Sequence, residues 1–318
     1  MRSPTSDPSA ALLLGADVGA TRARVRVRDR DGRLLAAAEG AGFNVNSTGD
    51  GALAGLRTTV QEVLVAAGID PRRVPVRAAL GIAGAGPAHH AQVEQLVRSA
   101  LAGIGLLPQH VTVTDDQITA FAAGSAGGSG LLLLGGTGSA AVRYRDFVPC
   151  RRVDGMGWLL GDTGSGVWIG RRVLQAAAAD LDARGPASAL TAAVLSRLGI
   201  APDGAEDPRQ ALIAAIHPLA PAAWGAFAPL TEGCATDPVA QEILAEASRE
   251  LIAKVDAVRR EEDGDLAGAE EIVLVGSVLT RNATVSAAVR AGLAERGLRV
   301  LEAAEPVEGA LRLAARDD

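Results

Sequence analysis

The chain has 318 residues, of which 48% are hydrophobic, and this length predicts two domains rather than one core. A net charge of −6, an aromatic share of 3% and the lack of a dense basic cluster argue against nucleic-acid binding. Cys150 and Cys234 stand far apart, a spacing that favours a reducing cytoplasm over a disulfide framework or a zinc site. No apolar run reaches about 18 residues, so we expect no membrane span, and 1–10 is expected to form a short disordered lead.

The first half of the chain predicts a meander followed by alternating helices and strands. Residues 11–17, 23–29 and 34–38 are expected to be antiparallel strands, because apolar and polar residues alternate and Asp31-Gly32 is a hairpin signal. Further strands are expected at 76–82 and 111–114, and helices at 53–67, 91–101 and 118–123. The glycine-rich segment 124–130 is expected to end this half.

The second half opens as the first one does, with a leucine-rich strand, a glycine turn and a second strand at 131–145. The stretch LLLG occurs at the start of both halves, which suggests duplicated α/β domains. Later helices are expected at 171–198, 239–260, 284–296 and 308–315, and strands at 272–275 and 299–302. This alternation predicts an α/β fold with a mainly parallel sheet.

Three glycine-rich turns follow predicted strands, at 15–21, 135–139 and 275–278. Glycine lets a ligand approach the backbone closely and leaves amides free to point at an anion. None of the three is a Walker A loop or a Rossmann GxGxxG turn. One such turn alone fits an ordinary hairpin, but three in one chain predict a phosphate-binding protein.

Acidic residues stand near these strand ends. Asp17 could hold Mg²⁺ beside phosphates or simply form a turn. Asp116 could accept a hydroxyl proton, while either Asp115 or Asp116 could cap the next helix. Asp162 could bind a sugar hydroxyl or cap a helix, and Asn44 offers both a donor and an acceptor from a loop.

These segments, in this order, resemble a known family. GADVGATRAR, LLLLGGTGSAA and VLVGSVLTRN look like the first phosphate, second phosphate and adenosine motifs of the superfamily of sugar kinases, heat-shock chaperones and actin. GFNVNSTG, TDD and GMGWLLGDTGSGVWIGRR look like the N-acetylglucosamine kinase branch of the BadF/BadG/BcrA/BcrD ATPase family. The resemblance covers the chain from about residue 12 to 315.

The resemblance implies an α/β protein of two ribonuclease-H-like (actin-like ATPase) domains around a central cleft. Residues 11–122 would form the sugar and phosphate side, and 123–318 the nucleotide side with a helical insert, the last helix being able to pack back on the first domain. The implied activity is ATP- and Mg²⁺-dependent phosphorylation of the 6-hydroxyl of N-acetylglucosamine or a closely related amino sugar. A cytoplasmic homodimer is expected.

The same resemblance assigns roles to residues. Asp116 matches the catalytic base and Asp17 the carboxylate near Mg²⁺. The residues that match sugar-binding positions are Asn44, Gly84, Asp115 and Asp162, and those that match ATP-binding positions are Gly19, Ala20, Thr21, Arg22, Gly136, Thr137, Gly138, Ser139, Gly276 and Ser277. Two positions depart from the family pattern, because Asp115 replaces Asn or Ser and Thr163 replaces Glu.

Two other functions fit the same fold. An ATPase that activates a 2-hydroxyacyl-CoA dehydratase needs cysteines for an iron–sulfur cluster, and only Cys150 lies near the nucleotide motifs in the sequence. A non-catalytic sugar or nucleotide sensor of the transcription-factor kind carries a DNA-binding segment before the first phosphate motif, where only the short lead stands here. The sequence leaves the sugar open among N-acetylglucosamine, glucosamine, N-acetylmuramic acid and glucose.

Overall fold

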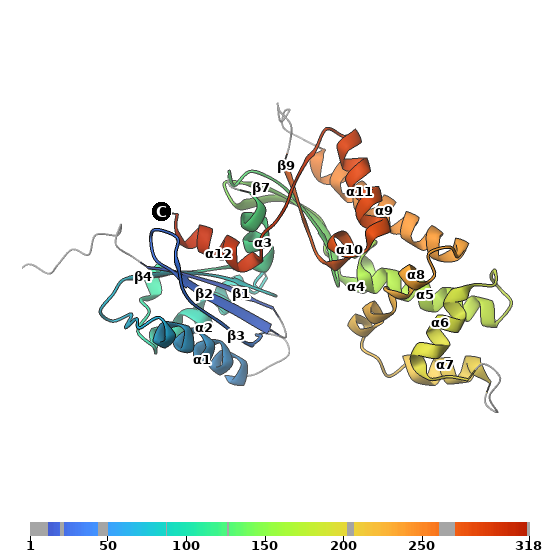
Figure 1. The fold of residues 1–318 in the computed structure, drawn as a ribbon, viewed down its shortest axis with the longest axis horizontal. Helices are drawn as coiled ribbons and strands as arrows, with labels where there is room; N and C mark the ends of the chain where they lie inside the picture. Colours follow the sequence, from blue (N-terminus) through green and yellow to red (C-terminus); the bar gives the residue numbers. More distant parts are fainter. Residues whose placement is uncertain are drawn as a thin grey trace, which may run out of the picture. The chain divides into compact units, whose positions relative to one another are not determined.

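The chain divides into two compact units (Figure 1). The computed structural model describes residues 12–19, 22–43, 50–86, 88–125, 127–201, 207–260 and 271–316. Unit 1 consists of Met1–Gly128, Asp146–Val148 and Glu302–Asp318, and unit 2 consists of Ser129–Arg145 and Pro149–Leu301. The helix that ends at Gly124 packs against the last helix of the chain, and both belong to unit 1.

Unit 1 contains a five-stranded sheet. Its order is β3 (Leu34–Ala41), β2 (Arg22–Arg28), β1 (Leu12–Val18), β4 (Val76–Ile82) and β5 (Val111–Asp115). Pairs β1–β2 and β2–β3 are antiparallel, whereas β1–β4 and β4–β5 are parallel. The sheet is therefore mixed and not mainly parallel as predicted, because the first three strands are joined by hairpins and only the later ones by helical crossovers.

The two faces of this sheet are covered in different ways. Helices α1 (Asp50–Ala66) and α2 (His90–Ala102) bury one face in an apolar core that includes Leu14, Val25 and Leu80. Helices α3 (Asp116–Gly124) and α12 (Pro306–Ala314) lie on the other face (Figure 1). Glycine allows their close approach, since a Cβ on Gly81 of β4 would lie 2.1 Å from Thr119 Oγ1 in α3.

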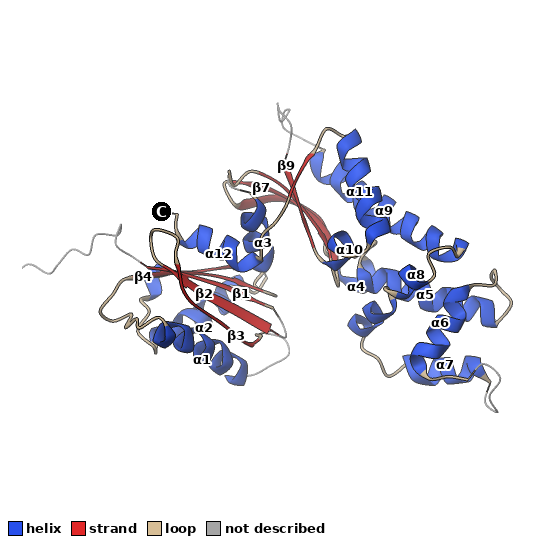
Figure 2. Ribbon diagram, viewed as in Figure 1, coloured by secondary structure: helices blue, strands red, loops and turns tan. Residues whose placement is uncertain are grey.

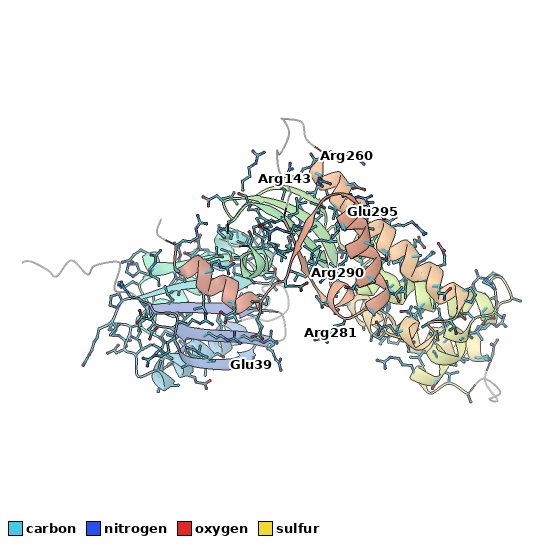
Figure 3. The ribbon with its side chains drawn as sticks, turned by 45° about the horizontal axis from the view of Figure 1, so that its top comes forward. Glu39, Arg143, Arg260, Arg281, Arg290 and Glu295 are labelled. Atoms are coloured by element: carbon cyan, nitrogen blue, oxygen red, sulfur yellow. The ribbon has the colours of Figure 1, made fainter. Side chains whose placement is uncertain are left out.

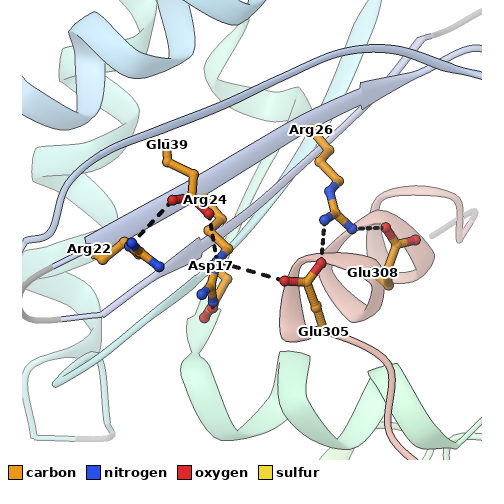
Figure 4. A network of polar contacts seen from close by, with 7 residues as sticks. All are labelled: Asp17, Arg22, Arg24, Arg26, Glu39, Glu305 and Glu308. Carbon is orange, nitrogen blue, oxygen red and sulfur yellow. Dashed lines mark hydrogen bonds and ion pairs between the residues drawn. The ribbon is translucent and has the colours of Figure 1, made fainter.

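Charged side chains connect α12 to β2 (Figure 4). Arg26 forms ion pairs with both Glu305 and Glu308. Beside it, Arg24 Nε lies 3.8 Å from Glu305 Oε1 and 3.1 Å from Glu39 Oε1, where Glu39 projects from the edge strand β3 (Figure 3). Partly exposed pairs of this kind contribute little energy, so we expect them to orient the helix while its apolar contacts hold it.

Unit 2 repeats the arrangement of unit 1. Its sheet runs in the order β10 (Arg299–Leu301), β9 (Glu271–Val275), β6 (Gly130–Gly135), β7 (Ser139–Arg145) and β8 (Val148–Asp154). Counted within its own unit, each sheet has the strand order third, second, first, fourth, fifth. Figure 2 shows the strands in red and the helices in blue. Strand β6 pairs antiparallel with β7 and parallel with β9, as β1 does with β2 and β4.

The helices of unit 2 form a larger layer than those of unit 1. Their bounds are α4 (Gly157–Leu160), α5 (Gly166–Leu181), α6 (Ala189–Leu198), α7 (Pro208–Ile216), α8 (Leu230–Gly233), α9 (Pro238–Arg259), α10 (Ser277–Thr280) and α11 (Ala283–Glu295). The helical region predicted at 171–198 is two helices, separated near Gly185-Pro186. Helix α9 is 22 residues long but charged, and none of the helices in the described ranges has the length and apolar character that spanning a membrane requires.

Candidate functional site

Asp17 lies at the carboxyl end of β1, on the sheet face that α12 and α3 cover. In the strand register it pairs with Arg24 of β2 and Gly81 of β4. Burial raises the pKa of Asp17, whereas the Arg24 guanidinium, with Nη1 3.8 Å from Asp17 Oδ2, lowers it and the charge of Glu305 raises it again. The result is a raised pKa, so this carboxyl holds a proton more readily than an exposed aspartate does.

Asp115 and Asp116 lie where β5 ends and α3 begins. Asp115 is the N-cap of α3, and its Oδ1 accepts a hydrogen bond from the Gln117 amide at 2.9 Å. Asp116 is the first residue of the helix. Burial, then the hydrogen bond and charge of Asp115, and then the charge of Asp17 raise the pKa of Asp116 to about 8. The capping role left open by the sequence therefore falls to Asp115, and the three carboxyls interact within unit 1.

Two loop glycines predicted at the site lie next to these strand ends. Gly84 follows β4 in a left-handed conformation with a φ of +85°, and the Gly19 amide donates to the Arg22 carbonyl at 2.9 Å. The Arg22 side chain is 60% exposed, and its Nε lies 3.4 Å from Glu39 Oε2. The residues predicted to bind ligands that lie outside the described ranges are Ala20, Thr21 and Asn44.

The loop Gly136–Ser139, called the phosphate loop below, joins β6 to β7 in unit 2. The Gly136 amide donates to the Gly138 carbonyl at 2.9 Å, and the Gly136 carbonyl accepts from the Gly166 amide of α5 at 2.8 Å. Thr137 is exposed at the tip, whereas Ser139 is buried. The loop is therefore held in one shape by its own turn and by the start of α5.

The predicted adenosine motif, Gly276 and Ser277, contacts the phosphate loop. Gly276 has a φ of +101°, and a Cβ on it would lie 2.4 Å from the Gly135 carbonyl oxygen and 2.6 Å from the Gly136 amide nitrogen. Ser277 is exposed at the first position of α10. Two of the three glycine-rich turns thus meet backbone against backbone at the carboxyl ends of the parallel strands β6 and β9.

Asp162 also contacts the phosphate loop. Its Oδ1 accepts a hydrogen bond from the Ser139 amide at 3.2 Å, and its Oδ2 would lie 2.9 Å from a Cβ on Gly138. Burial raises the pKa of Asp162, the Ser139 amide lowers it, and the charge of Asp154 raises it, with a net rise. The carboxylate thus fixes the end of the phosphate loop, a contact that sequence reasoning did not predict.

Sequence reasoning also missed Lys254 and Asp154. Lys254 is 4% exposed on α9, its Nζ lies 3.2 Å from Asp154 Oδ2, and it donates to Thr163 Oγ1 at 2.8 Å. The sequence did contain a signal, because Lys254 is the only lysine among 31 lysines and arginines. It also lies between Leu251 and Val255 on the apolar side of the predicted helix.

The carboxylates of unit 1 suit a magnesium ion that is held mainly by phosphate oxygens. Magnesium in phosphoryl-transfer proteins uses one or two carboxylates together with the phosphates of the substrate. Asp17 offers such an oxygen beside a glycine-rich turn. A single carboxylate of this kind fits Mg²⁺ that arrives with a nucleotide.

The duplicated mixed sheets define an α/β protein with the two-domain, actin-like ATPase fold of sugar kinases. The glycine-rich turns stand at the ends of corresponding strands in the two units. The chain belongs to the BadF/BadG/BcrA/BcrD ATPase family, which it matches over residues 14–314. The fold and the family inferred from the sequence motifs are confirmed.

Individual relatives are sugar kinases by name. The glucosamine kinase of Vibrio cholerae serotype O1 is 24% identical over 276 residues, which are 84% of this chain and 85% of the relative. The structure of a candidate N-acetylglucosamine kinase from Chromobacterium violaceum is 27% identical with a TM-score of 0.77, covering 96% of this chain and 100% of that one. Another candidate N-acetylglucosamine kinase, from Porphyromonas gingivalis, shares the fold at 21% identity with a TM-score of 0.67, covering 95% and 97%.

Proposed function

We propose that this protein transfers the γ-phosphoryl group of ATP to the 6-hydroxyl of N-acetylglucosamine or a closely related amino sugar. Membership of the family and the similarity to a glucosamine kinase and a candidate N-acetylglucosamine kinase support a sugar kinase that acts on amino sugars. Phosphoryl transfer asks the protein mainly for positioning and charge neutralisation. Carboxyls and glycine-rich turns at strand ends supply both.

In this proposal Asp116 accepts the proton of the sugar hydroxyl as the oxygen attacks the γ-phosphorus. The new oxygen–phosphorus bond forms while the bond to the β,γ-bridging oxygen breaks, and ADP leaves. Asp17 holds Mg²⁺ through water. The phosphate loop binds the ATP phosphates, and Gly276 and Ser277 lie against the adenosine.

The raised pKa of the buried Asp116 carboxyl is the observation that supports the proposal most directly. A general base is most effective when its pKa lies near the working pH. Burial and two neighbouring carboxyls raise the pKa of Asp116 to about 8, and the residue stands at the carboxyl end of the parallel strand β5. A residue that only caps a helix does not need to be buried or to have a raised pKa, and the capping hydrogen bond is made by Asp115 instead.

The remaining parts of the proposal rest on the sequence. Sugar hydroxyls bind to Asn44, Gly84, Asp115 and Asp162, and Ala20, Thr21, Gly19 and Arg22 line the ATP phosphates. The protein works as a cytoplasmic homodimer, which size-exclusion chromatography with light scattering tests.

The decisive experiment measures ADP release by the purified protein with Mg²⁺, ATP and a panel of sugars. The panel contains N-acetylglucosamine, glucosamine, N-acetylmuramic acid and glucose, and proton-coupled ³¹P NMR identifies the phosphorylated hydroxyl. We expect sugar-dependent ADP release with an amino sugar and a 6-phosphate product.

Two other results would point to the alternative functions. ATP hydrolysis at a rate that no sugar changes would support an activator ATPase. Visible absorbance from an iron–sulfur cluster, in protein prepared without oxygen, would support the same function. Sugar and nucleotide binding by calorimetry without any turnover would support a sensor.

A further inference from the structure

Lys254 occupies a position where a cation is costly. It lies on the buried side of α9, where Leu251 and Val255 are both 0% exposed. A buried ammonium destabilises a protein unless it is paired and hydrogen-bonded. The chain has 31 lysines and arginines, and Lys254 is the only lysine among them. This position therefore takes a compact ammonium with three donors, whereas arginine serves as the cation everywhere else.

All three donors of this ammonium have partners. Lys254 Nζ donates to the carbonyl oxygen of Thr163 and, at 2.8 Å, to Thr163 Oγ1. It also lies 3.2 Å from Asp154 Oδ2. An ammonium can donate three hydrogen bonds, so these contacts saturate it. Both partners belong to the segment that leads from β8 to α5.

The same partners connect to Asp162 and to the phosphate loop. Asp154 Oδ1 accepts from the Asp162 amide at 2.8 Å, and the Thr163 carbonyl accepts from Ser139 Oγ at 2.7 Å. Asp154 and Asp162 both have left-handed backbones, with φ of +63° and +54°. Residues other than glycine adopt this conformation at a cost and keep it only where surrounding contacts hold them. Lys254 contacts both Asp154 and Thr163 and so connects the residues that hold this segment.

We infer that Lys254 is a positioning residue for the segment Gly161–Ser165, called the sugar loop below, and that it keeps Asp162 in place to bind the sugar. The inference rests on the proposed function, because it assigns Asp162 to the sugar. Lys254 itself touches neither reacting group.

The phosphate loop has supports that do not involve Lys254. Its Gly136 bonds to Gly138 and Gly166 and packs against Gly276. The sugar loop, in contrast, receives Lys254 directly on Thr163 and indirectly through Asp154. Loss of Lys254 should therefore weaken sugar binding far more than ATP binding, a split that simple loss of stability would not produce.

The test uses the double variant Lys254→Met with Asp154→Asn, which removes both charges and leaves no uncompensated buried ion. Arg249→Met is the matched control, because Arg249 is an exposed cation on the same helix, 63% exposed and paired with Glu242. We expect the double variant to raise the KM for the sugar by about tenfold or more, while the KM for ATP changes less than about threefold. Hydrogen exchange of the peptide 155–166 should become faster, and the control should behave as wild type.

The outcomes separate the inference from the proposed function. A folded double variant with unchanged exchange in 155–166, or with faster exchange but an unchanged sugar KM, overturns the inference. If the double variant does not fold, Thr163→Val carries the test, because it keeps the charge pair and removes one hydrogen bond of Lys254. An unchanged sugar KM in that variant also overturns the inference. A wild-type protein that phosphorylates no sugar overturns the proposed function and with it the assignment of Asp162 to the sugar, whereas the positioning of Gly161–Ser165 by Lys254 is still decided by hydrogen exchange, which needs no turnover.

Discussion

Asp115 and Asp116 form a hydrogen-bonded pair of carboxyl groups in which only Asp115 caps the helix. Two adjacent carboxyls do not ionise together readily, because like charges repel at short range in a buried setting. Asp115 accepts the Gln117 amide, while burial and the hydrogen bond and charge of Asp115 raise the pKa of Asp116 to about 8. The start of α3 therefore separates a structural carboxylate from one that can exchange a proton near neutral pH.

Replacing Asp116 by asparagine tests the assignment of the base. The amide keeps the size of the side chain but accepts no proton, so Asp116→Asn should lower kcat by about 10²- to 10⁴-fold. ATP binding, measured by calorimetry, should change little, because Asp116 is proposed to contact the sugar hydroxyl and not the nucleotide. Asp31→Asn, in an exposed turn, is the control and should retain full activity. Turnover near the wild-type rate in Asp116→Asn would remove this residue from the mechanism.

The pH dependence of the reaction should report the same group. A base works when it is deprotonated, and burial together with Asp115 and Asp17 raises the pKa of Asp116 to about 8. The kcat/KM for the sugar should therefore rise with pH through this value. Asp115→Asn removes the neighbouring charge, so the rising limb should move to lower pH. Initial rates between about pH 5.5 and 9.5 measure this, and a limb that stays in place would show that Asp115 does not tune the base.

Stability should respond to pH in the opposite sense to activity. The folded state holds Asp116 with a pKa of about 8, above the 3.8 of an ordinary aspartate, so it binds more protons than the unfolded state between these values. The free energy of unfolding should fall as pH rises through this window. Asp116→Asn should exceed wild type by more than about 1.4 kcal/mol at high pH, the equivalent of one pKa unit, with the difference vanishing near pH 4. Urea titrations at several pH values measure it, and a constant difference would contradict the raised pKa.

The sequence predicted those parts of the fold that local patterns determine. Strand β4 has the bounds predicted for it, Val76–Ile82, because a short apolar run bounded by turn residues is typical of a buried strand. The repeated LLLG segment indicated duplicated domains, and the two units do share one strand order. The antiparallel strands at the start of the chain were predicted, but the later alternation of strands and helices led to the wrong expectation that parallel pairs would dominate the sheet.

The candidate site was predictable where it depends on strand ends and not where it depends on distant contacts. Asp17 and Asp116 could be named because the carboxyl ends of parallel strands meet at one edge of a sheet. Lys254 contacts Thr163, which lies 91 positions earlier in the chain, and no periodic pattern reports such a pairing. The hydrogen bond between Asp162 and Ser139 also joins residues far apart in the sequence, so no local pattern predicts it. It depends on the left-handed backbone at Asp154 and Asp162, which the sequence does not indicate.

The attachment of α12 should depend on apolar packing more than on its ion pairs. Leu311 is 4% exposed and lies against Gly15 of β1, so Leu311→Ala should cost about 2–5 kcal/mol of unfolding free energy. Arg26→Met removes the pairs with Glu305 and Glu308 but should cost less than about 1 kcal/mol. Chemical denaturation compares the two variants, and a larger effect for Arg26→Met would show that the charges hold the helix.

Gly276→Ala tests the contact between the adenosine motif and the phosphate loop. The new methyl group would lie 2.4 Å from the Gly135 carbonyl oxygen, so the two backbones must separate, and we expect the KM for ATP to rise by about tenfold or more. Gly297→Ala is a matched control, because Gly297 has a left-handed φ of +71° with nothing within 4 Å of an added Cβ. Gly276 also has a ψ of 154°, in a region that glycine alone readily adopts, so Gly276→Ala adds backbone strain to its clash with the loop, whereas Gly297→Ala controls for a left-handed φ without any clash. Equal ATP affinity in the two variants would separate Gly276 from nucleotide binding, whereas a loss confined to Gly276→Ala would place the nucleotide against this turn.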